Sequence, residues 1–394
     1  MIKRLALPAA GGALAFVAWT GPEWAGLATL LPLLWIAASD RKTAALTVFA
    51  YYLVGARSTP DSAWAFFQIE HSFILGIGLW IAASALHATP WILAWKASPS
   101  PGQFTLRLLL VITALTIPPL GWIGWLNPWL AASSVFPSMG WGAIAAGLLL
   151  LLTFPLLWLG HHRAIVISAA MVLASTQILL PAPVAAAPTA WVGMETHWGG
   201  PPKPATLGEL RRWKQIALEA ERQFNAGAAV VVFPEQIAGV SGARAEVFLA
   251  AYLQPQLAAG KTLVFGSTVY EQNRPFNAVS ILSAGAQDRY LARQSVPVAM
   301  WKPWATDSFD TAWMGRNAFN IGGRKVAFSV CFEDFLFGLG LLSFLHERPD
   351  VIVSVANAWW AVGDGEIDVQ HLHVKLLARI FDVPMIRAIN RPKA

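Results

Sequence analysis

The sequence predicts a polytopic α-helical membrane domain followed by a water-soluble α/β domain. The 394 residues are 56% hydrophobic and only 13% charged, whereas soluble domains carry about 25% charged residues. The charge is unevenly placed, because residues 1–187 hold twelve charged side chains and residues 188–394 hold thirty-eight. We therefore expect a transmembrane bundle over residues 1–182, a Pro/Ala-rich linker over 183–190 and a soluble domain over 191–394.

Seven apolar stretches are expected to form the membrane domain. They cover residues 5–20, 25–39, 43–56, 70–94, 106–125, 139–160 and 164–182. Several reach the roughly 20 residues that a helix needs to span the hydrocarbon core. The first three are shorter, so tilted or shallow hairpins are an alternative there. We expect the first stretch to be retained rather than cleaved as a signal peptide, because further spans follow without a clear cleavage site.

Charges between the stretches predict the orientation. Basic residues precede the first, third, fifth and seventh stretches: Lys3, Arg4, Arg41, Lys42, Lys96, Arg107, His161, His162 and Arg163. The alternate loops hold Glu23, Arg57, Asp61 and Glu70, or no charge. The positive-inside rule then predicts a multi-pass protein of the bacterial inner membrane, with a cytoplasmic N-terminus and a periplasmic C-terminal domain.

The composition argues against several function classes. Residues 188–394 carry 20 Lys and Arg against 18 Asp and Glu, without a basic stripe, so nucleic-acid binding is not expected. The apolar stretches lack paired ionisable residues, which disfavours a transporter. His161 and His162 lack the spacing of a helical metal site, and we expect neither a metal nor a cofactor. One cysteine cannot form an internal disulfide framework.

The C-terminal half alternates short apolar runs with helix-like segments. Strands are expected within residues 228–236, 262–271, 277–284, 324–334 and 350–360. Residues 206–227 have the amphipathic pattern of a helix that stops at a glycine. This alternation is typical of an α/β fold in which helices cover sheets.

Polar residues occur where three of these runs end. Glu235 ends the first run, Cys331 and Glu333 end another, and Asn357 lies in the last. Sites of α/β proteins assemble at the carboxyl ends of strands. A carboxylate beside a thiol can accept its proton, so that the thiolate attacks a carbonyl or nitrile carbon. The alternatives are a buried, apolar cysteine and carboxylates that only bind loop amides.

Four segments in this half resemble a known family. They read "VVFPEQIAG", "VAFSVCFEDF", "SVANAWWAVGDGEIDVQH" and "VPMIRAIN". In this order, after an apolar N-terminal half, they resemble apolipoprotein N-acyltransferase, a nitrilase-like (carbon–nitrogen hydrolase) domain on a transmembrane bundle. The resemblance implies an α-β-β-α sandwich with a Glu-Lys-Cys triad. Glu235 would be the general base, Cys331 the nucleophile and Glu333 a supporting carboxylate.

The segment that should carry the lysine departs from that family. It reads "YLARQSVPVAMWKP", with Ala292 in the lysine position and Met300 in the position of an essential glutamate. Lys302 has the right head group further along the segment, whereas Arg293 cannot serve as a proton carrier. The chain also ends at Ala394, without the last span of the acyltransferase, which disfavours lipoprotein acylation.

The whole chain resembles the TraB family of conjugal transfer proteins, relatives of that acyltransferase. This resemblance implies a role in plasmid conjugal transfer, with the lipid bilayer, pilus or mating-pair proteins and a phospholipid acyl donor as partners. Two hypotheses remain: a cysteine-dependent acyltransferase or amidase that forms a thioester, or an inactive scaffold of the conjugation apparatus. The first predicts that Lys302 completes the catalytic set. The predicted substrate-binding residues are Trp301, Asn357, Trp359 and Trp360, although tryptophans also form interfacial belts.

Overall fold

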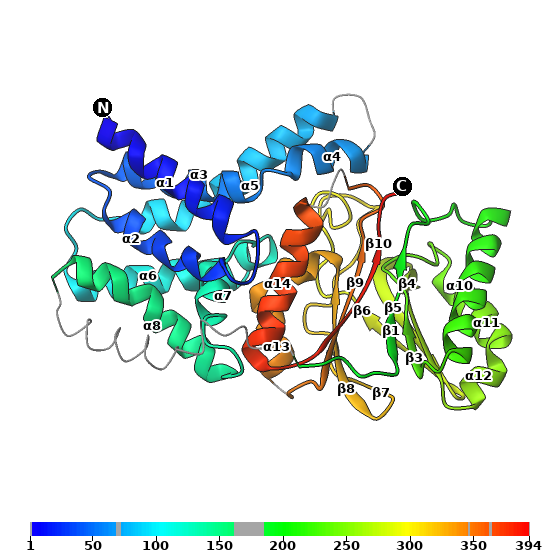
Figure 1. Ribbon diagram of the computed structural model, residues 1–394. Helices are drawn as coiled ribbons and strands as arrows, with labels where there is room; N and C mark the ends of the chain where they lie inside the picture. Colours follow the sequence, from blue (N-terminus) through cyan, green and yellow to red (C-terminus); the bar gives the residue numbers. More distant parts are fainter. Residues whose placement is uncertain (1, 68–71, 161–184, 346, 362–364, 394) are drawn as a thin grey trace. The chain divides into compact units, whose positions relative to one another are not determined.

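The computed structural model describes residues 2–67, 72–160, 185–345, 347–361 and 365–393 (Figure 1). The chain forms two compact units. The first comprises Met1–Val184, Phe335–Gly338 and Val362–Asp382, and the second comprises Ala185–Asp334, Leu339–Ala361 and Val383–Ala394. The sequence analysis placed all of residues 191–394 in one domain, whereas two segments of that range belong to the first unit.

The first unit is helical. Its helices are α1 (Ile2–Ala18), η1 (Ala25–Leu30), α2 (Leu31–Ile36), α3 (Arg41–Gly55), α4 (Thr59–Phe67), α5 (Ser72–Ala94), α6 (Pro101–Thr116), η2 (Leu120–Trp122), α7 (Pro128–Ser133), α8 (Trp141–Trp158) and α14 (Gly365–Phe381). Side chains cap several of them. Asp40 accepts a hydrogen bond from Thr43 N at the start of α3, and Ser100 with Gln103 forms a capping box on α6, as expected for these residue types.

Two of these helices, α5 and α8, are long and apolar enough to cross a membrane, judged by length and composition only. The apolar helices that overlap the expected stretches 5–20, 25–39 and 106–125 are shorter, covering Leu5–Ala18, Ala25–Ile36 and Pro101–Thr116. Helix α6 ends at Thr116, just before Pro118 and Pro119, because proline cannot continue a helix. The expected stretch 164–182, with its preceding basic residues, lies outside the described residues. Of the seven expected spans, the structure therefore supports two by length.

Aromatic side chains connect the segments Phe335–Gly338 and Val362–Asp382 to the rest of the helical unit. Seven rings contact one another in series: Trp19, His373, Phe335, Trp125, His87, Tyr52 and Tyr51. The Nε1 of Trp19 donates to the hydroxyl of Tyr51 at 2.9 Å and closes the series. The Nε2 of His373 accepts a hydrogen bond from Leu126 N at 2.9 Å. Because burial lowers the pKa of His373 to about 4, this acceptor stays available at neutral pH.

The second unit contains two five-stranded sheets. Their strands are β1 (Trp191–Gly193), β2 (Glu195–Thr196), β3 (Val230–Val232), β4 (Thr262–Glu271), β5 (Arg274–Ser283), β6 (Ala286–Leu291), β7 (Phe319–Ile321), β8 (Arg324–Val330), β9 (Val351–Asn357) and β10 (Met385–Asn390). The orders are β1-β3-β4-β5-β6 and β2-β10-β9-β8-β7. Strands β5, β6 and β7 run antiparallel to their neighbours, and the other pairs are parallel.

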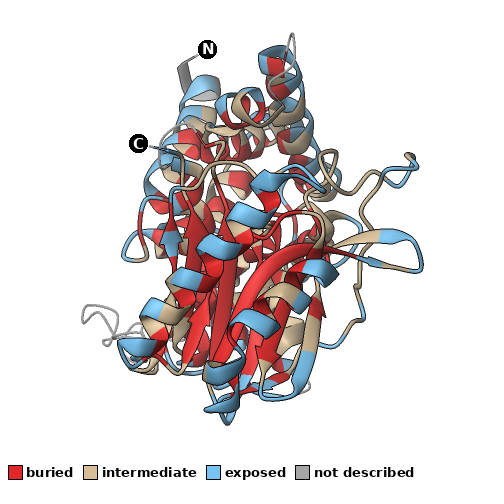
Figure 2. Ribbon diagram, turned by 90° about the vertical axis from the view of Figure 1, so that its right-hand side faces the viewer, coloured by how far each residue is buried: buried red, intermediate tan, exposed pale blue. Residues whose placement is uncertain are grey.

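The two sheets pack face to face over a shared apolar core. Val232 and Val264 from the first sheet meet Phe328 and Val353 from the second in this core. A second core lies between the first sheet and three helices, α10 (Leu207–Asn225), α11 (Gly242–Tyr252) and α12 (Gln254–Ala258). Figure 2 shows strands that are mostly buried, beside helices whose outer surfaces are exposed. Each expected strand region holds one of these strands, so the predicted α/β class is confirmed.

The unit by itself has three layers, a helical one and two sheets. The resemblance implied a fourth, helical layer on the second sheet, and this layer stays a prediction, since α14 is grouped with the helical unit. The remaining helices, η4 (Cys331–Phe335) and α13 (Phe337–Leu345), follow β8 directly. Both are divided between the units, with Asp334 the last residue of η4 in the second unit.

Asn390 ties together the carboxyl ends of strands in the second sheet. It is fully buried at the end of β10. Its Oδ1 accepts hydrogen bonds from Thr196 Oγ1 at 2.9 Å and Trp198 N at 3.0 Å. Its Nδ2 donates to Gly199 O and to Asn357 Oδ1, each at 2.8 Å. One side chain thus fixes the ends of β2, β9 and β10.

We expect Asn390→Leu to destabilise the α/β unit. The substitution leaves several buried polar groups without partners, which costs on the order of 3 kcal/mol and lowers the midpoint of thermal unfolding by roughly 5–10 °C. Tryptophan fluorescence of the full chain in detergent measures this midpoint. Asn320→Leu on β7 is the matched control, because Asn320 is exposed. Equal midpoints for both variants would contradict the role given to Asn390.

Candidate active site

Cys331 begins a strained turn directly after β8. Its φ angle is +51°, a left-handed conformation that residues other than glycine rarely adopt and that costs about 1–3 kcal/mol. The residue is partly exposed, and its thiol donates a hydrogen bond to the carboxylate of Glu235. The structure therefore brings together the predicted nucleophile and the predicted base, which are 96 residues apart in the sequence.

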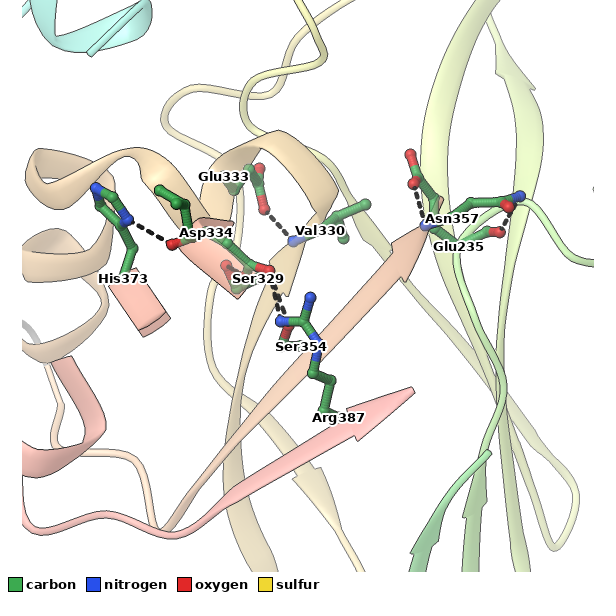
Figure 3. Close-up of polar contacts among 10 residues, drawn as sticks. Glu235, Ser329, Val330, Glu333, Asp334, Ser354, Asn357, His373 and Arg387 are labelled. Carbon is green, nitrogen blue, oxygen red and sulfur yellow. Dashed lines mark hydrogen bonds and ion pairs between the residues drawn. The ribbon is translucent and has the colours of Figure 1, made fainter. Parts of the chain in front are cut away.

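Glu235 follows β3 and is only 4% exposed. Its Oε1 accepts a hydrogen bond from Asn277 Nδ2 at 2.6 Å, and its Oε2 accepts one from Asn357 N at 3.0 Å. Its backbone oxygen accepts a hydrogen bond from Asn357 Nδ2 at 2.9 Å. Asn357 therefore binds both the carboxylate and the backbone of Glu235 (Figure 3). Gly266 of β4 is required beside it, because a Cβ there would lie 2.4 Å from Glu235 Cα.

Burial dominates the electrostatics of this pair. It raises the pKa of Glu235 to about 7, against the lowering effect of the hydrogen bonds from Cys331, Asn277 and Asn357. Burial also raises the pKa of Cys331 well above its ordinary value, and the negative charges of Glu235 and Asp334 raise it further. At rest the thiol is protonated, and Glu235 has the pKa of a group that can exchange a proton near neutral pH.

Glu333 joins the nucleophile turn to the segment after β6. Its carboxylate accepts hydrogen bonds from the Tyr290 hydroxyl at 2.9 Å, Arg293 N at 2.5 Å, Gln294 N at 3.1 Å and Val330 N at 2.9 Å. The contact with Val330 N appears in Figure 3. Glu333 therefore fixes the turn that begins at Cys331 to the segment after β6, and its predicted part as a supporting carboxylate stays a prediction.

Asp334, the next residue, fixes the same turn to the second sheet. It accepts hydrogen bonds from Ser329 Oγ at 2.5 Å and Ser354 Oγ at 2.9 Å. Arg387 of β10 lies 3.4 Å away and forms an ion pair with it (Figure 3). Burial raises the pKa of Asp334 to about 6, although Arg387 lowers it. Three buried carboxylates thus surround the start of η4, each anchored to different elements.

The cations near the predicted lysine position have other partners. Lys302 Nζ lies 2.5 Å from Asp307 Oδ2 in an ion pair, rather than in the hydrogen-bond network of Glu235. The buried Arg293 donates from Nε to the Tyr290 hydroxyl at 3.2 Å. Ala292 is packed in the core between the sheets. The sequence analysis expected Lys302 to complete the catalytic set, and the structure pairs it with a carboxylate in its own loop.

The predicted substrate-binding tryptophans lie at different places. Trp301 packs edge-to-face against Trp313 in the loop between β6 and β7, with ring centroids 6.2 Å apart. The Nε1 of Trp360 donates to Asn357 O, at the end of β9, at 3.0 Å. Trp359 packs against Gly200, where an added Cβ would lie 3.3 Å from its ring. Of the four, Asn357 is hydrogen-bonded to Glu235.

Sequence reasoning missed Asn277 and Gly266. Asparagine is unfavourable inside a strand, so Asn277 within the apolar run of β5 was a signal that could have been noticed. Gly266 lies in an apolar strand and its role depends on the close approach of Glu235, which sequence patterns do not show. Among the residues that the structure describes, no group of three or more His, Cys, Asp or Glu side chains is placed to hold a metal ion.

The Cys331–Glu235 pair predicts a specific pH dependence of thiol reactivity. Because Glu235 must be ionised to accept the thiol proton, alkylation of Cys331 by iodoacetamide should rise as the pH increases through about 7 and then level off. Glu235→Gln should react more slowly and lose this step. Intact-mass spectrometry of the full chain measures the rate. Glu347→Gln, at the surface, is the control and should keep the pH step. Loss of the step in Glu347→Gln, or its persistence in Glu235→Gln, would contradict the assignment of Glu235 as the base.

The chain is similar in sequence to conjugal transfer proteins. No protein-family model matches it. It is 28% identical over 387 residues to the probable conjugal transfer protein TraB of Sinorhizobium fredii, covering 93% of this chain and 94% of the relative. It is also 28% identical over 402 residues to the conjugal transfer protein TraB of Agrobacterium fabrum, covering 93% and 89%.

Other similarities are partial. A putative apolipoprotein N-acyltransferase of Bordetella parapertussis is 32% identical over 120 residues, which are 26% of this chain and 22% of the relative. A mutant of the Nesterenkonia AN1 amidase from the nitrilase superfamily aligns with a TM-score of 0.39 and 14% identity, over 51% of this chain and 74% of that chain. A carbon–nitrogen hydrolase of Helicobacter pylori aligns with a TM-score of 0.41 and 11% identity, over 51% and 72%. The resemblance seen in the sequence motifs is confirmed, and the chain is a homologue of the TraB conjugal transfer proteins.

Proposed function

We propose that this protein is a membrane-anchored acyltransferase or amidase that acts through Cys331 during plasmid conjugal transfer. The observation that carries the proposal is the hydrogen bond from the Cys331 thiol to the buried carboxylate of Glu235. The process is suggested by the full-length relatives, which are named conjugal transfer proteins. The similarity to an acyltransferase, although partial, is in keeping with acyl chemistry.

The pair supports a two-step reaction. The sulfur attacks the carbonyl carbon of an acyl donor while its proton passes to Glu235, and a carbon–sulfur bond forms. The donor's carbon–oxygen or carbon–nitrogen bond then breaks, and Glu235 returns the proton to the leaving group. An amine or water attacks the thioester in the second step, with Glu235 taking its proton, and the thiol is restored. A pKa of about 7 suits Glu235 for both directions of transfer.

The helical unit supplies the proposed membrane anchor. Helices α5 and α8 have the length and hydropathy of membrane spans, and they expose large apolar side chains such as Ile74, Leu93 and Trp158. The basic residues before alternate apolar stretches then orient the chain. We propose a multi-pass protein of the inner membrane with its N-terminus in the cytoplasm and its α/β unit in the periplasm, where pilus or mating-pair proteins are candidate partners.

One observation favours the alternative, a catalytically inactive scaffold. The charges that act most strongly on the thiol are the carboxylates of Glu235 and Asp334, and both oppose ionisation. Cysteine nucleophiles are commonly activated by a nearby cation, yet Lys302 is paired with Asp307 and Ala292 occupies the lysine position. A domain of this kind could serve conjugation through its surface alone.

Conjugation frequency separates the enzyme from the scaffold. We expect donors that carry Cys331→Ser to transfer plasmid at the level of a deletion, because serine keeps the volume but is a far poorer nucleophile. An immunoblot must show normal accumulation of the variant. Unchanged transfer with normal accumulation would favour the scaffold.

Lys302 gives an independent test of the catalytic set. Because it forms an ion pair with the exposed side chain of Asp307, we expect Lys302→Met to change transfer by no more than about twofold, with Asp307→Asn as its matched control. Loss of a cation that stabilises an oxyanion would instead reduce the rate about 10²–10³-fold. A loss of that size in Lys302→Met, but not in Asp307→Asn, would restore the lysine to the site.

A further inference from the structure

We propose that Asn277 determines the specificity of the Cys331 site by accepting a hydrogen bond from an N–H group of the ligand. The acyl donor is then a carboxamide that carries at least one N–H, not an ester. The inference rests on the proposed function, because it names the ligand chemistry of the same site. It chooses between the two donors that the reaction allows.

Asn277 lies in β5, with 2% of its surface exposed. Its Nδ2 donates to Glu235 Oε1 at 2.6 Å, and its backbone oxygen accepts a bond from Ala292 N at 2.8 Å. Its Oδ1 is buried and has no hydrogen-bond partner in the described part of the chain. Buried acceptors without partners are rare in folded proteins and often mark a functional site.

The orientation of the Asn277 amide follows from its neighbour. If the amide were rotated by half a turn, Oδ1 would face Glu235 Oε1, and two acceptors would repel each other across an ionised carboxylate. The donor side of the amide therefore faces Glu235 whenever that carboxylate is ionised, which is the state in which it can accept the thiol proton. This arrangement leaves Oδ1 directed away from the carboxylate, buried and without a partner among the described residues.

Asn277 and the reacting sulfur belong to the same hydrogen-bond network around Glu235. The Cys331 thiol and the Asn277 amide both donate to the one carboxylate of Glu235, the amide at 2.6 Å. The other acceptors here are engaged, since Glu235 Oε2 binds Asn357 N and Asn357 Oδ1 binds Asn390. A carboxamide held against the sulfur can therefore direct its N–H to Asn277 Oδ1, whereas an ester has no hydrogen to offer.

Two electrophiles of equal size test this preference. Both 2-chloroacetamide and chloroacetone present a CH₂Cl group, but the second has a methyl group in place of the NH₂. Sulfur attack on CH₂ forms the carbon–sulfur bond, releases chloride and passes the thiol proton to Glu235. Because the chain has one cysteine, the mass of the adduct reports on Cys331 alone. Each rate, measured on the full chain in detergent, is divided by the rate of the same reagent with glutathione.

We expect the normalised rates of the wild-type chain to favour the amide by at least about tenfold, since a site built to bind an N–H rejects an analogue that lacks it. Asn277→Leu should reduce this ratio to about one. Asn277→Asp keeps an acceptor and should retain the preference, even if both rates fall. Loss of the Nδ2 donor affects both reagents through Glu235, so it cancels in the ratio. Asn320→Leu, exposed on β7, is the matched control.

The outcomes separate the two proposals. A wild-type ratio near one, with Cys331 reacting readily, overturns the role of Asn277 and leaves the catalytic cysteine standing. The role of Asn277 is likewise overturned if Asn277→Leu keeps the wild-type ratio. If Cys331 reacts with neither reagent, the thiol is not a usable nucleophile and both proposals are overturned. The wild-type ratio needs no variant, so the inference remains testable even if Asn277→Leu does not fold.

Discussion

The carboxylate of Glu235 is buried between strands of both sheets, and the geometry of the site follows from its need for hydrogen-bond donors. A carboxylate removed from water is strongly destabilising unless donors replace the lost solvent. The donors here are Asn277 from β5 in the first sheet, and Cys331 and Asn357 at the ends of β8 and β9 in the second. Satisfying one side chain therefore sets the position of β5 relative to the ends of β8 and β9.

Glu333 and Asp334 extend this principle to the turn that carries the thiol. Glu333 is held by backbone N–H groups of the segment after β6, and Asp334 by serines and Arg387 of the second sheet. Such anchors make it possible to keep Cys331 in a left-handed conformation. The consequence is electrostatic, because the negative charge that organises the turn also opposes ionisation of its thiol. The proposed chemistry therefore requires that the ligand, when it binds, activates the thiol.

Much of this site could be predicted from sequence, because Glu235, Cys331 and Asn357 lie at the ends of apolar runs that form strands. Lys302 shows the limit of that reasoning. Its head group suited the chemistry, but Asp307, five residues further along, pairs with it. The position of Asn277 beside Glu235 depends on β5 running antiparallel to β4 and β6. The place of α14 in the helical unit depends on stacking between His373 and Trp19. Contacts between residues this far apart leave no local pattern in the sequence.

Three unfavourable features meet at one place in the α/β unit: the left-handed backbone of Cys331, the buried carboxylate of Glu235 and the unpartnered Oδ1 of Asn277. Each has a simple remedy, since glycine relieves the first and uncharged or apolar residues relieve the others. A domain that served only as a scaffold would gain stability from any of these changes. Strain of this kind persists where it contributes to a mechanism. Its concentration around one thiol therefore favours chemistry at Cys331 over a purely structural role.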